Sequence, residues 1–184
     1  MSKISLTPNV SGTGTLTIAA PNTSTDRTLT LPDETGTIIS STSSQVAGPA
    51  FSAYQTGNTG FSSGTATKFT YGTEVFDTAS CYDTTNSRFT PNVAGYYQVN
   101  ANAHIDVTSG TVALCWVYKN GSSYKRGMQI SFSSGNFSTF EPTVSALVYM
   151  NGTTDYIEIY GYCSGTSPSM GGDRWFDAHL ARAA

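Results

Sequence analysis

Hydrophobic and polar residues alternate along most of the chain, and a period of two residues is typical of β-strands. The clearest run covers residues 95–107, where the odd positions are apolar and the even positions are mostly polar. The apolar positions are Tyr97, Val99, Ala101, Ala103, Ile105 and Val107. Since neighbouring side chains of a strand point to opposite faces, this run predicts one long strand with a buried and a solvent-facing side.

Two further runs carry Asn-Gly pairs, which favour tight β-turns. Residues 112–117 are apolar on both faces, which predicts a central or covered strand, and Asn120 and Gly121 predict a hairpin after it. The same device recurs over residues 143–163 around Asn151 and Gly152, and the last run, 174–184, ends the chain inside a strand. With no helical periodicity, the pattern predicts an all-β protein, an antiparallel sandwich or jelly roll.

The composition changes near residue 45. Residues 1–45 contain no aromatic residue, and their apolar positions form short alternating runs around Leu16, Ile18, Leu29 and Leu31. So little apolar area does not offset the chain entropy of a lone ribbon. We therefore predict two segments: an extended β anchor or stalk over 1–45 that packs against other copies or another protein, and a head over 46–184.

Charge and composition exclude several classes of protein. Only 11% of the 184 residues are charged, the formal net charge is −3, and no basic cluster occurs, so nucleic-acid binding is not expected. The sequence has no apolar stretch of the length that spans a bilayer and no apolar secretion signal at its start, which predicts a chain without membrane insertion. Three cysteines without CxxC spacing are expected to be buried free thiols.

Residues able to support catalysis are sparse. The chain has two histidines, no nucleophile, phosphate-binding or metalloprotease motif, and acidic residues scattered singly, so we expect a binding protein with no catalytic residues and no cofactor. His104 and Asp106 lie two apart, and Asp173 and Asp177 flank the last strand. They indicate either a cation site or a polar strand face, and the second is favoured because a calcium site needs six or more oxygens.

Aromatic residues suggest contact surfaces. Tyr156, Tyr160 and Tyr162 share one face of a predicted strand, either as a sugar-binding shelf or as a surface buried against another copy of the chain, and the interface is favoured. Other aromatic residues near turns are candidates for ligand-facing loops, although each also suits core or rim packing. These are Tyr118, Tyr124, Phe132, Phe137 and Phe140.

Residues 49–184 resemble the globular head of the complement C1q and tumour-necrosis-factor superfamily. The matching pieces follow the family's order. They are residues 76–77, which precede a loop at residues 82–83, then the corner at residues 89–97, the turn at residues 119–121 and the final strand around Phe176. The resemblance implies a ten-stranded jelly roll that forms tight homotrimers. It implies a core or three-fold-interface position for Tyr97, Val99, Ile157, Ile159, Phe176 and Leu180. The chain lacks a collagen stalk and a match to the family's calcium ligands, so ligand and metal do not transfer.

The Thr-rich stretch 12–38 is similar to repeats of bacteriophage fibre and virion structural proteins. Together the two resemblances imply a trimeric virion appendage, made in the host cytoplasm, whose N-terminal segment attaches to a tail or capsid protein. Its head would bind a host-surface glycan or protein. The alternatives are a capsid decoration or head fibre, and a glycan-binding lectin module. In the trimer, the four N-terminal aliphatic residues would bury against one another or against a virion socket.

Overall fold

The computed structural model describes Thr7, 10–15, Thr17, Ala19, 22–26, Thr28, 48–133 and 137–184. The chain divides into two units, Met1–Thr37 and Ile38–Ala184. The predicted contact residues Leu16, Ile18, Leu29 and Leu31 lie outside the described residues. The roles of these residues and the boundary after residue 45 therefore stay predictions.

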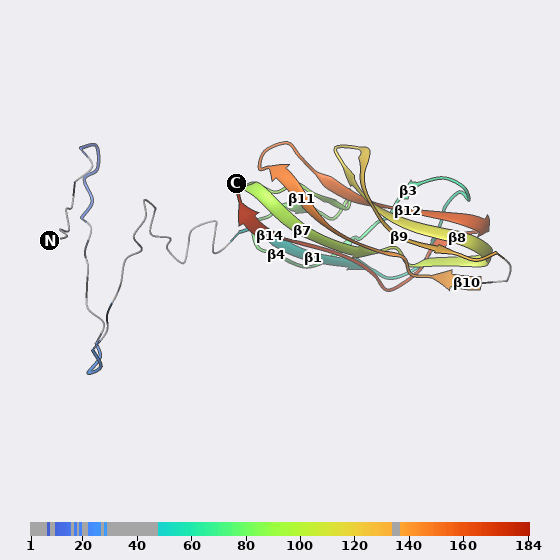
Figure 1. The fold of residues 1–184 in the computed structure, drawn as a ribbon, viewed down its shortest axis with the longest axis horizontal. Coiled ribbons are helices and arrows are strands. Elements are labelled where there is room, and N and C mark those ends of the chain that lie inside the picture. Colours follow the sequence, from blue (N-terminus) through green and yellow to red (C-terminus); the bar gives the residue numbers. More distant parts are fainter. Residues whose placement is uncertain are drawn as a thin grey trace. The chain divides into compact units, whose positions relative to one another are not determined.

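The second unit is an antiparallel β-sandwich (Figure 1). One sheet has five strands in the order β11-β7-β14-β1-β4, all antiparallel. Its strands are β1 (Ala50–Gln55), β4 (Thr73–Asp77), β7 (Ala94–Asn102), β11 (Thr143–Asn151) and β14 (Arg174–Ala183). The predicted strand in the run 174–184 is confirmed as β14, which pairs with both β7 and β1 and so lies in the middle of this sheet.

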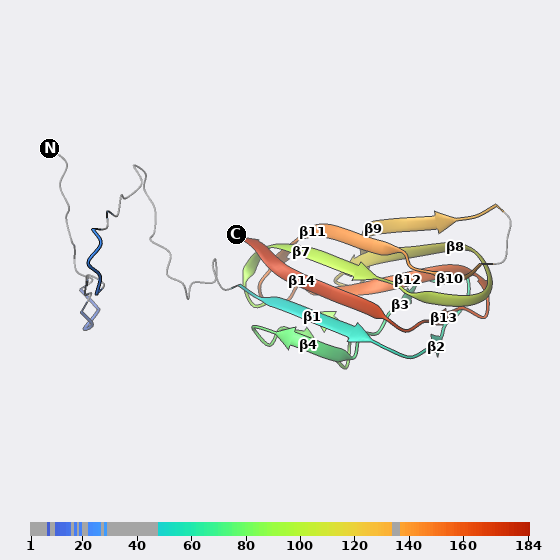
Figure 2. The ribbon, with the colours of Figure 1, turned by 90° about the horizontal axis from the view of Figure 1, so that it is seen from below.

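The second sheet has nine strands built around the long strand β8, which pairs with β12, β9, β10 and β13 (Figure 2). Its strands are β2 (Thr59–Gly60), β3 (Thr67–Lys68), β5 (Tyr82–Asp83), β6 (Arg88–Phe89), β8 (Ile105–Lys119), β9 (Ser122–Ser131), β10 (Phe137–Phe140), β12 (Ile157–Thr166) and β13 (Ser169–Met170). The resemblance implied ten strands, whereas the described residues form fourteen, five of which have two residues. The extra strands are short bridges that join loops to the sheet.

Aromatic rings fill the space between the sheets. Phe51 stacks on Tyr82 at 4.4 Å between ring centroids and on Phe89 at 4.6 Å, and its ring meets Phe176 edge-on at 4.8 Å. Tyr71 lies 5.6 Å from Phe176 and donates its hydroxyl proton to the carbonyl of Asn102. Rings at these separations add specific stabilisation to the apolar area that they bury.

The alternating run 95–107 forms two strands, and the prediction of one was wrong. β7 ends at Asn102 in the five-stranded sheet, and β8 begins at Ile105 in the other sheet. Between them, the amide of Ala103 donates to the carbonyl of Pro142 at 2.9 Å. Val99, Ala103 and Ile105 are all fully buried. The alternation continues across the corner because both sheets turn the same side toward the one core.

The two Asn-Gly pairs behave differently. Asn120 and Gly121 have φ of 51° and 76° and join β8 to β9 in a two-residue hairpin, as predicted. Asn151 instead ends β11, and its side-chain oxygen accepts hydrogen bonds from the amides of residues 153, 154 and 155. β11 pairs with β7 and β12 pairs with β8, so the predicted second hairpin is wrong.

Arg174 is 1% exposed, although among the described residues it forms no ion pair. Its guanidinium donates to the carbonyls of Thr70, Gly57 and Gly171, which belong to three separate connections. Burial lowers the pKa of this side chain from its ordinary value. The charge is thus held by carbonyl dipoles, and the three connections are tied to the start of β14.

Cys81, Cys115 and Cys163 are buried and form no disulfide, which confirms the prediction of free thiols. Burial raises the pKa of the Cys115 thiol to about 12, so this group stays protonated at neutral pH. In the part of the chain that the structure describes, no helix is long and apolar enough to cross a membrane.

Candidate interaction surface

The outward face of the five-stranded sheet carries large apolar side chains that nothing in the described chain covers. Tyr96 of β7 lies directly opposite Tyr149 of β11, with ring centroids 5.4 Å apart, and Leu147 is the next outward residue on β11. Their exposed fractions are 43% for Tyr96, 42% for Tyr149 and 55% for Leu147. A gathered apolar patch of this kind on a sheet face is typical of a protein interaction surface.

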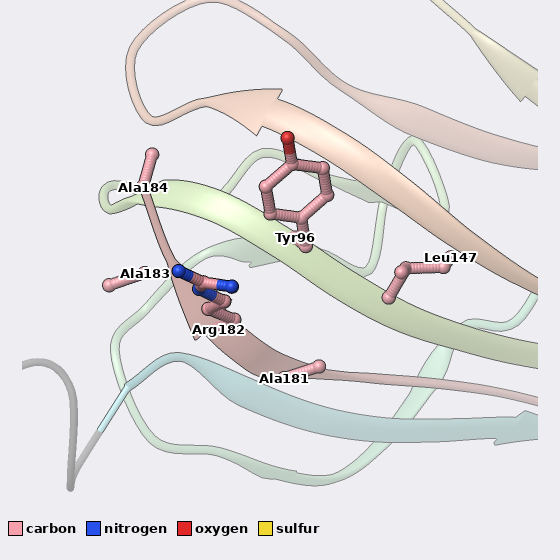
Figure 3. A pocket seen from close by; sticks show the side chains of 6 residues that line it. All are labelled: Tyr96, Leu147, Ala181, Arg182, Ala183 and Ala184. Atoms are coloured by element: carbon pink, nitrogen blue, oxygen red, sulfur yellow. The ribbon is translucent and has the colours of Figure 1, made fainter.

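A shallow depression of about 560 Å³ lies in this patch (Figure 3). The side chains come from three adjacent strands, β11, β7 and the end of β14, and Arg182 lies opposite Tyr96 in the register. The lining consists of Tyr96, Leu147, Ala181, Arg182, Ala183 and Ala184. The combination of a tyrosine, a leucine and one arginine is common in the centre of protein interfaces, where aromatic residues and arginine are enriched.

The middle of the same face is polar and internally hydrogen-bonded. Gln98 donates to the hydroxyl of Ser145 at 2.9 Å, and Ser145 donates to the side-chain oxygen of Asn100 at 2.9 Å. Asp177 lies opposite Asn100 and Ser52 in the register, and its Oδ1 atom is buried without a hydrogen-bond partner. Burial raises the pKa of the Asp177 carboxyl above its ordinary value of 3.8, and a hydrogen bond from Ser52 opposes this in part.

Replacing Asp177 with asparagine is expected to stabilise the protein at pH 7. Because the folded-state pKa is raised, the charged carboxylate destabilises the fold above that pKa, and the penalty disappears as the pH falls towards 3.8. We expect a gain of less than about 1 kcal/mol, since Asp177 is only partly buried and solvent screens part of its charge. Urea unfolding of both proteins between pH 4 and pH 7 measures it. A difference that grows on acidification would contradict this assignment.

The tyrosine row predicted from the sequence lies on the outward face of the nine-stranded sheet. Tyr160 stacks on Tyr118 of β8 at 3.8 Å, and Tyr162 meets Trp116 edge-on at 6.2 Å. The guanidinium of Arg88 lies 3.8 Å above the ring of Tyr156. The tyrosines are half-buried against their neighbours. Their predicted role as an interface remains a prediction.

Glu158 interrupts this row and is 3% exposed. Its Oε1 atom accepts hydrogen bonds from the Arg88 side chain, at 2.9 Å from Nη2, and from Lys68 Nζ at 3.3 Å. Two cations therefore share one buried carboxylate, which satisfies a charge that burial would otherwise penalise.

The residues predicted to lie in the core or at a three-fold interface fall mainly inside the single chain. Tyr97, Val99, Ile157, Ile159 and Phe176 are fully buried, and Leu180 is half-buried against the core. The structure thus accounts for their apolar character by packing within one copy. The outward residues of the same strands, such as Tyr96, are the ones available to a partner.

The aromatic residues predicted for ligand-facing loops lie in several environments. Phe140 is 2% exposed and belongs to the core, and Tyr118 is half-buried in β8. Tyr124 is exposed on β9. Phe132, which follows β9, and Phe137, the first residue of β10, are exposed and stack on each other at 3.7 Å. Of the five candidates, Tyr124, Phe132 and Phe137 expose ring surface.

His104 lies between two carboxylates that point at opposite sides of its ring. Its Nε2 atom is 3.3 Å from Oδ1 of Asp106, and its Nδ1 atom is 3.3 Å from Oε1 of Glu141. Carboxylates on opposite sides of an imidazole do not converge on one cation. Among the described residues, no group of three or more His, Cys, Asp or Glu side chains is arranged to hold a metal ion.

Sequence reasoning missed the outward apolar patch. The run 144–150 is apolar at nearly every position, with Leu147 and Tyr149 lying between the buried residues Val144, Val148 and Met150. The apolar residues on both faces of this run are the sequence signal that would have indicated a second contact surface.

Comparisons with known proteins agree with this fold. No family model and no curated protein matches the chain. Among solved structures, the globular domain of a zebrafish complement 1qA protein is similar with a TM-score of 0.52 and 12% identity, covering 74% of this chain and 98% of that one. Murine APRIL is similar with a TM-score of 0.54 and 9% identity, covering 72% and 98%. The predicted antiparallel jelly roll of the C1q and TNF type is thereby confirmed.

Proposed function

We propose that this chain is a trimeric appendage of a bacteriophage virion, with a C1q-like head that binds the host surface and an N-terminal segment that attaches to another virion protein. The observation that carries the self-association is the exposed apolar patch of Tyr96, Leu147 and Tyr149 beside the C-terminal end of β14. The phage assignment rests on the fibre-like repeats of residues 12–38.

The patch suits contact with a second and third copy of this chain. It lies on β7 and β14, the strands that the resemblance places at the core and the three-fold interface, and on β11, which pairs with β7. Each protomer would bury the two tyrosine rings and Leu147, and the rings would keep their hydroxyls for hydrogen bonds at the rim. Three heads on one axis would multiply weak single-site contacts with a host surface.

The head has two distinct ends. The amide of Leu180 donates to the carbonyl of Pro49 at 2.9 Å, so the chain enters the head beside its own C-terminal strand. β10 and β13 lie at the opposite end of the sandwich (Figures 1 and 2). We infer that this opposite end faces the host, since it is away from the start of the head.

Replacing Leu147 with arginine is expected to dissociate the trimer. Three buried arginines without counter-charges would lie around one axis, and each unpaired buried charge costs several kcal/mol. Native mass spectrometry would then shift from a trimer to a monomer of about 19.5 kDa. Val75, 61% exposed on β4 at the other edge of the same sheet, provides the matched control, and its arginine variant should stay trimeric. A wild-type monomer would contradict the proposed assembly.

The virion assignment has a separate test. Antibodies against the head should label intact phage particles in electron micrographs, at the tail tip for an attachment fibre. Label distributed over the shell would favour the alternative of a capsid decoration or head fibre. Particles without label would overturn the assignment.

A further inference from the structure

Strands β10 and β13 lie at the end of the head away from the C-terminus (Figure 2). A second depression, of about 430 Å³, is lined by residues of β8, β10 and β13 and of the connections beside them. It forms where β10 and β13 pair with the start of β8, so that Asp106 lies opposite both Thr139 and Ser169. Seven of its eight residues have polar side chains. The lining is Asn58, Asp106, Val107, Thr108, Ser138, Thr139, Ser167 and Ser169.

The carboxylate of Asp106 is held in one orientation by three segments of the chain. Its Oδ1 atom accepts a hydrogen bond from the Thr139 hydroxyl at 3.1 Å and faces His104 Nε2 at 3.3 Å. Its Oδ2 atom accepts a hydrogen bond from the Asn58 amide at 3.1 Å. The Asp106 side chain is 35% exposed, and its Oδ2 atom, with one donor, has capacity for another. The group is therefore ordered before any ligand arrives.

This lining fits the chemistry of a neutral sugar. A carboxylate accepts short hydrogen bonds from adjacent hydroxyls, and an amide together with serine and threonine hydroxyls can both donate and accept. The lining carries one carboxylate and no lysine or arginine, which disfavours sugars that bear acidic groups. One carboxylate is also too few for a stable calcium site.

We propose that this depression binds one neutral hexose unit of a host-surface glycan, with Asp106 and Asn58 as the residues that recognise its hydroxyls. The inference rests on the proposed host-binding function and names the ligand class and the place on the head. Because the depression lies on the sheet that does not carry the apolar patch, it stays accessible when that patch is buried between copies.

The test uses the full-length protein, labelled with ¹⁵N and titrated with D-glucose, D-galactose, D-mannose and N-acetyl-D-glucosamine. We expect at least one sugar to shift the side-chain amide signal of Asn58 together with the backbone signals of Thr108 and Ser169. Asp106→Asn, which nearly preserves the shape of the side chain, should weaken the binding of that sugar by at least about tenfold, because hydrogen bonds to an ionised acceptor are stronger than those to a neutral amide.

Asp83→Asn is the matched control. Asp83 is also a surface carboxylate ordered by an asparagine, with Oδ2 at 2.6 Å from the Asn86 amide, but it belongs to the β5–β6 turn. Its variant should bind the sugar as the wild type does. The inference would be overturned if none of the four sugars shifted these signals. It would also be overturned if Asp106→Asn bound the sugar as tightly as the wild type, or if the shifted signals were confined to Trp116 and Tyr160. In each case a trimer found on virions would leave the proposed function standing.

Discussion

Replacing Arg174 with methionine is expected to lower the free energy of unfolding by about 3–5 kcal/mol. Methionine fills a similar volume but donates no hydrogen bond, so the carbonyls of Gly57, Thr70 and Gly171 would lose their donor inside the protein. Each buried acceptor left unsatisfied costs about 1–3 kcal/mol, and water entering from the connections would recover part of this. Denaturation by urea at one fixed protein concentration measures the change.

Two other variants sharpen this test. Arg174→Lys keeps the charge but cannot reach three carbonyls at once, so its stability should lie between those of the wild type and the methionine variant. Arg126, exposed on β9, provides the matched control, and Arg126→Met should change the free energy of unfolding by less than about 0.5 kcal/mol. Equal effects at positions 174 and 126 would show that the buried guanidinium does not hold the connections together.

Replacing Phe176 with alanine is expected to cost about 3–5 kcal/mol of stability, the range found when a fully buried phenylalanine is truncated. The change removes the ring that contacts Phe51, Tyr71 and Tyr82 and leaves a cavity between the two sheets. Thermal unfolding followed by circular dichroism, with chemical denaturation for the free energy, gives the measurement.

Phe76 serves as the comparison for Phe176. It is 46% exposed on β4, so Phe76→Ala should cost less than about 1 kcal/mol. If Phe176→Ala had an equally small effect, the aromatic cluster would not be the main core of the head.

The alternation of apolar residues predicted the strands well but not their partners. From Tyr97 to Val107 the pattern continues unbroken although the chain changes sheets near Ala103, because a period of two records only which side faces the core. In the same way, Asn151 and Gly152 indicate a turn without indicating a pairing. The difference from Asn120 and Gly121 lies in spacing: two residues separate β8 from β9, whereas five separate β11 from β12.

The candidate surfaces were less accessible from the sequence than the fold. The tyrosine row could be predicted because its members are close in sequence, two of them on β12 and Tyr156 just before it. The depression lined by Tyr96, Leu147 and Arg182 combines three strands that are distant in sequence, and so does the depression around Asp106. Their neighbours become known only once the strand order is known. Arg174 was missed because its partners are backbone carbonyls, which leave no trace in residue identities.

The position of Ala184 matters for anyone who produces this protein. The terminal alanine lines the depression between β7, β11 and β14, and its amide donates to the carbonyl of Ala94 at 3.0 Å. A purification tag fused there would begin inside the surface that copies are proposed to share, and would compete with them for it. Recombinant material intended for assembly studies should therefore carry its tag away from Ala184.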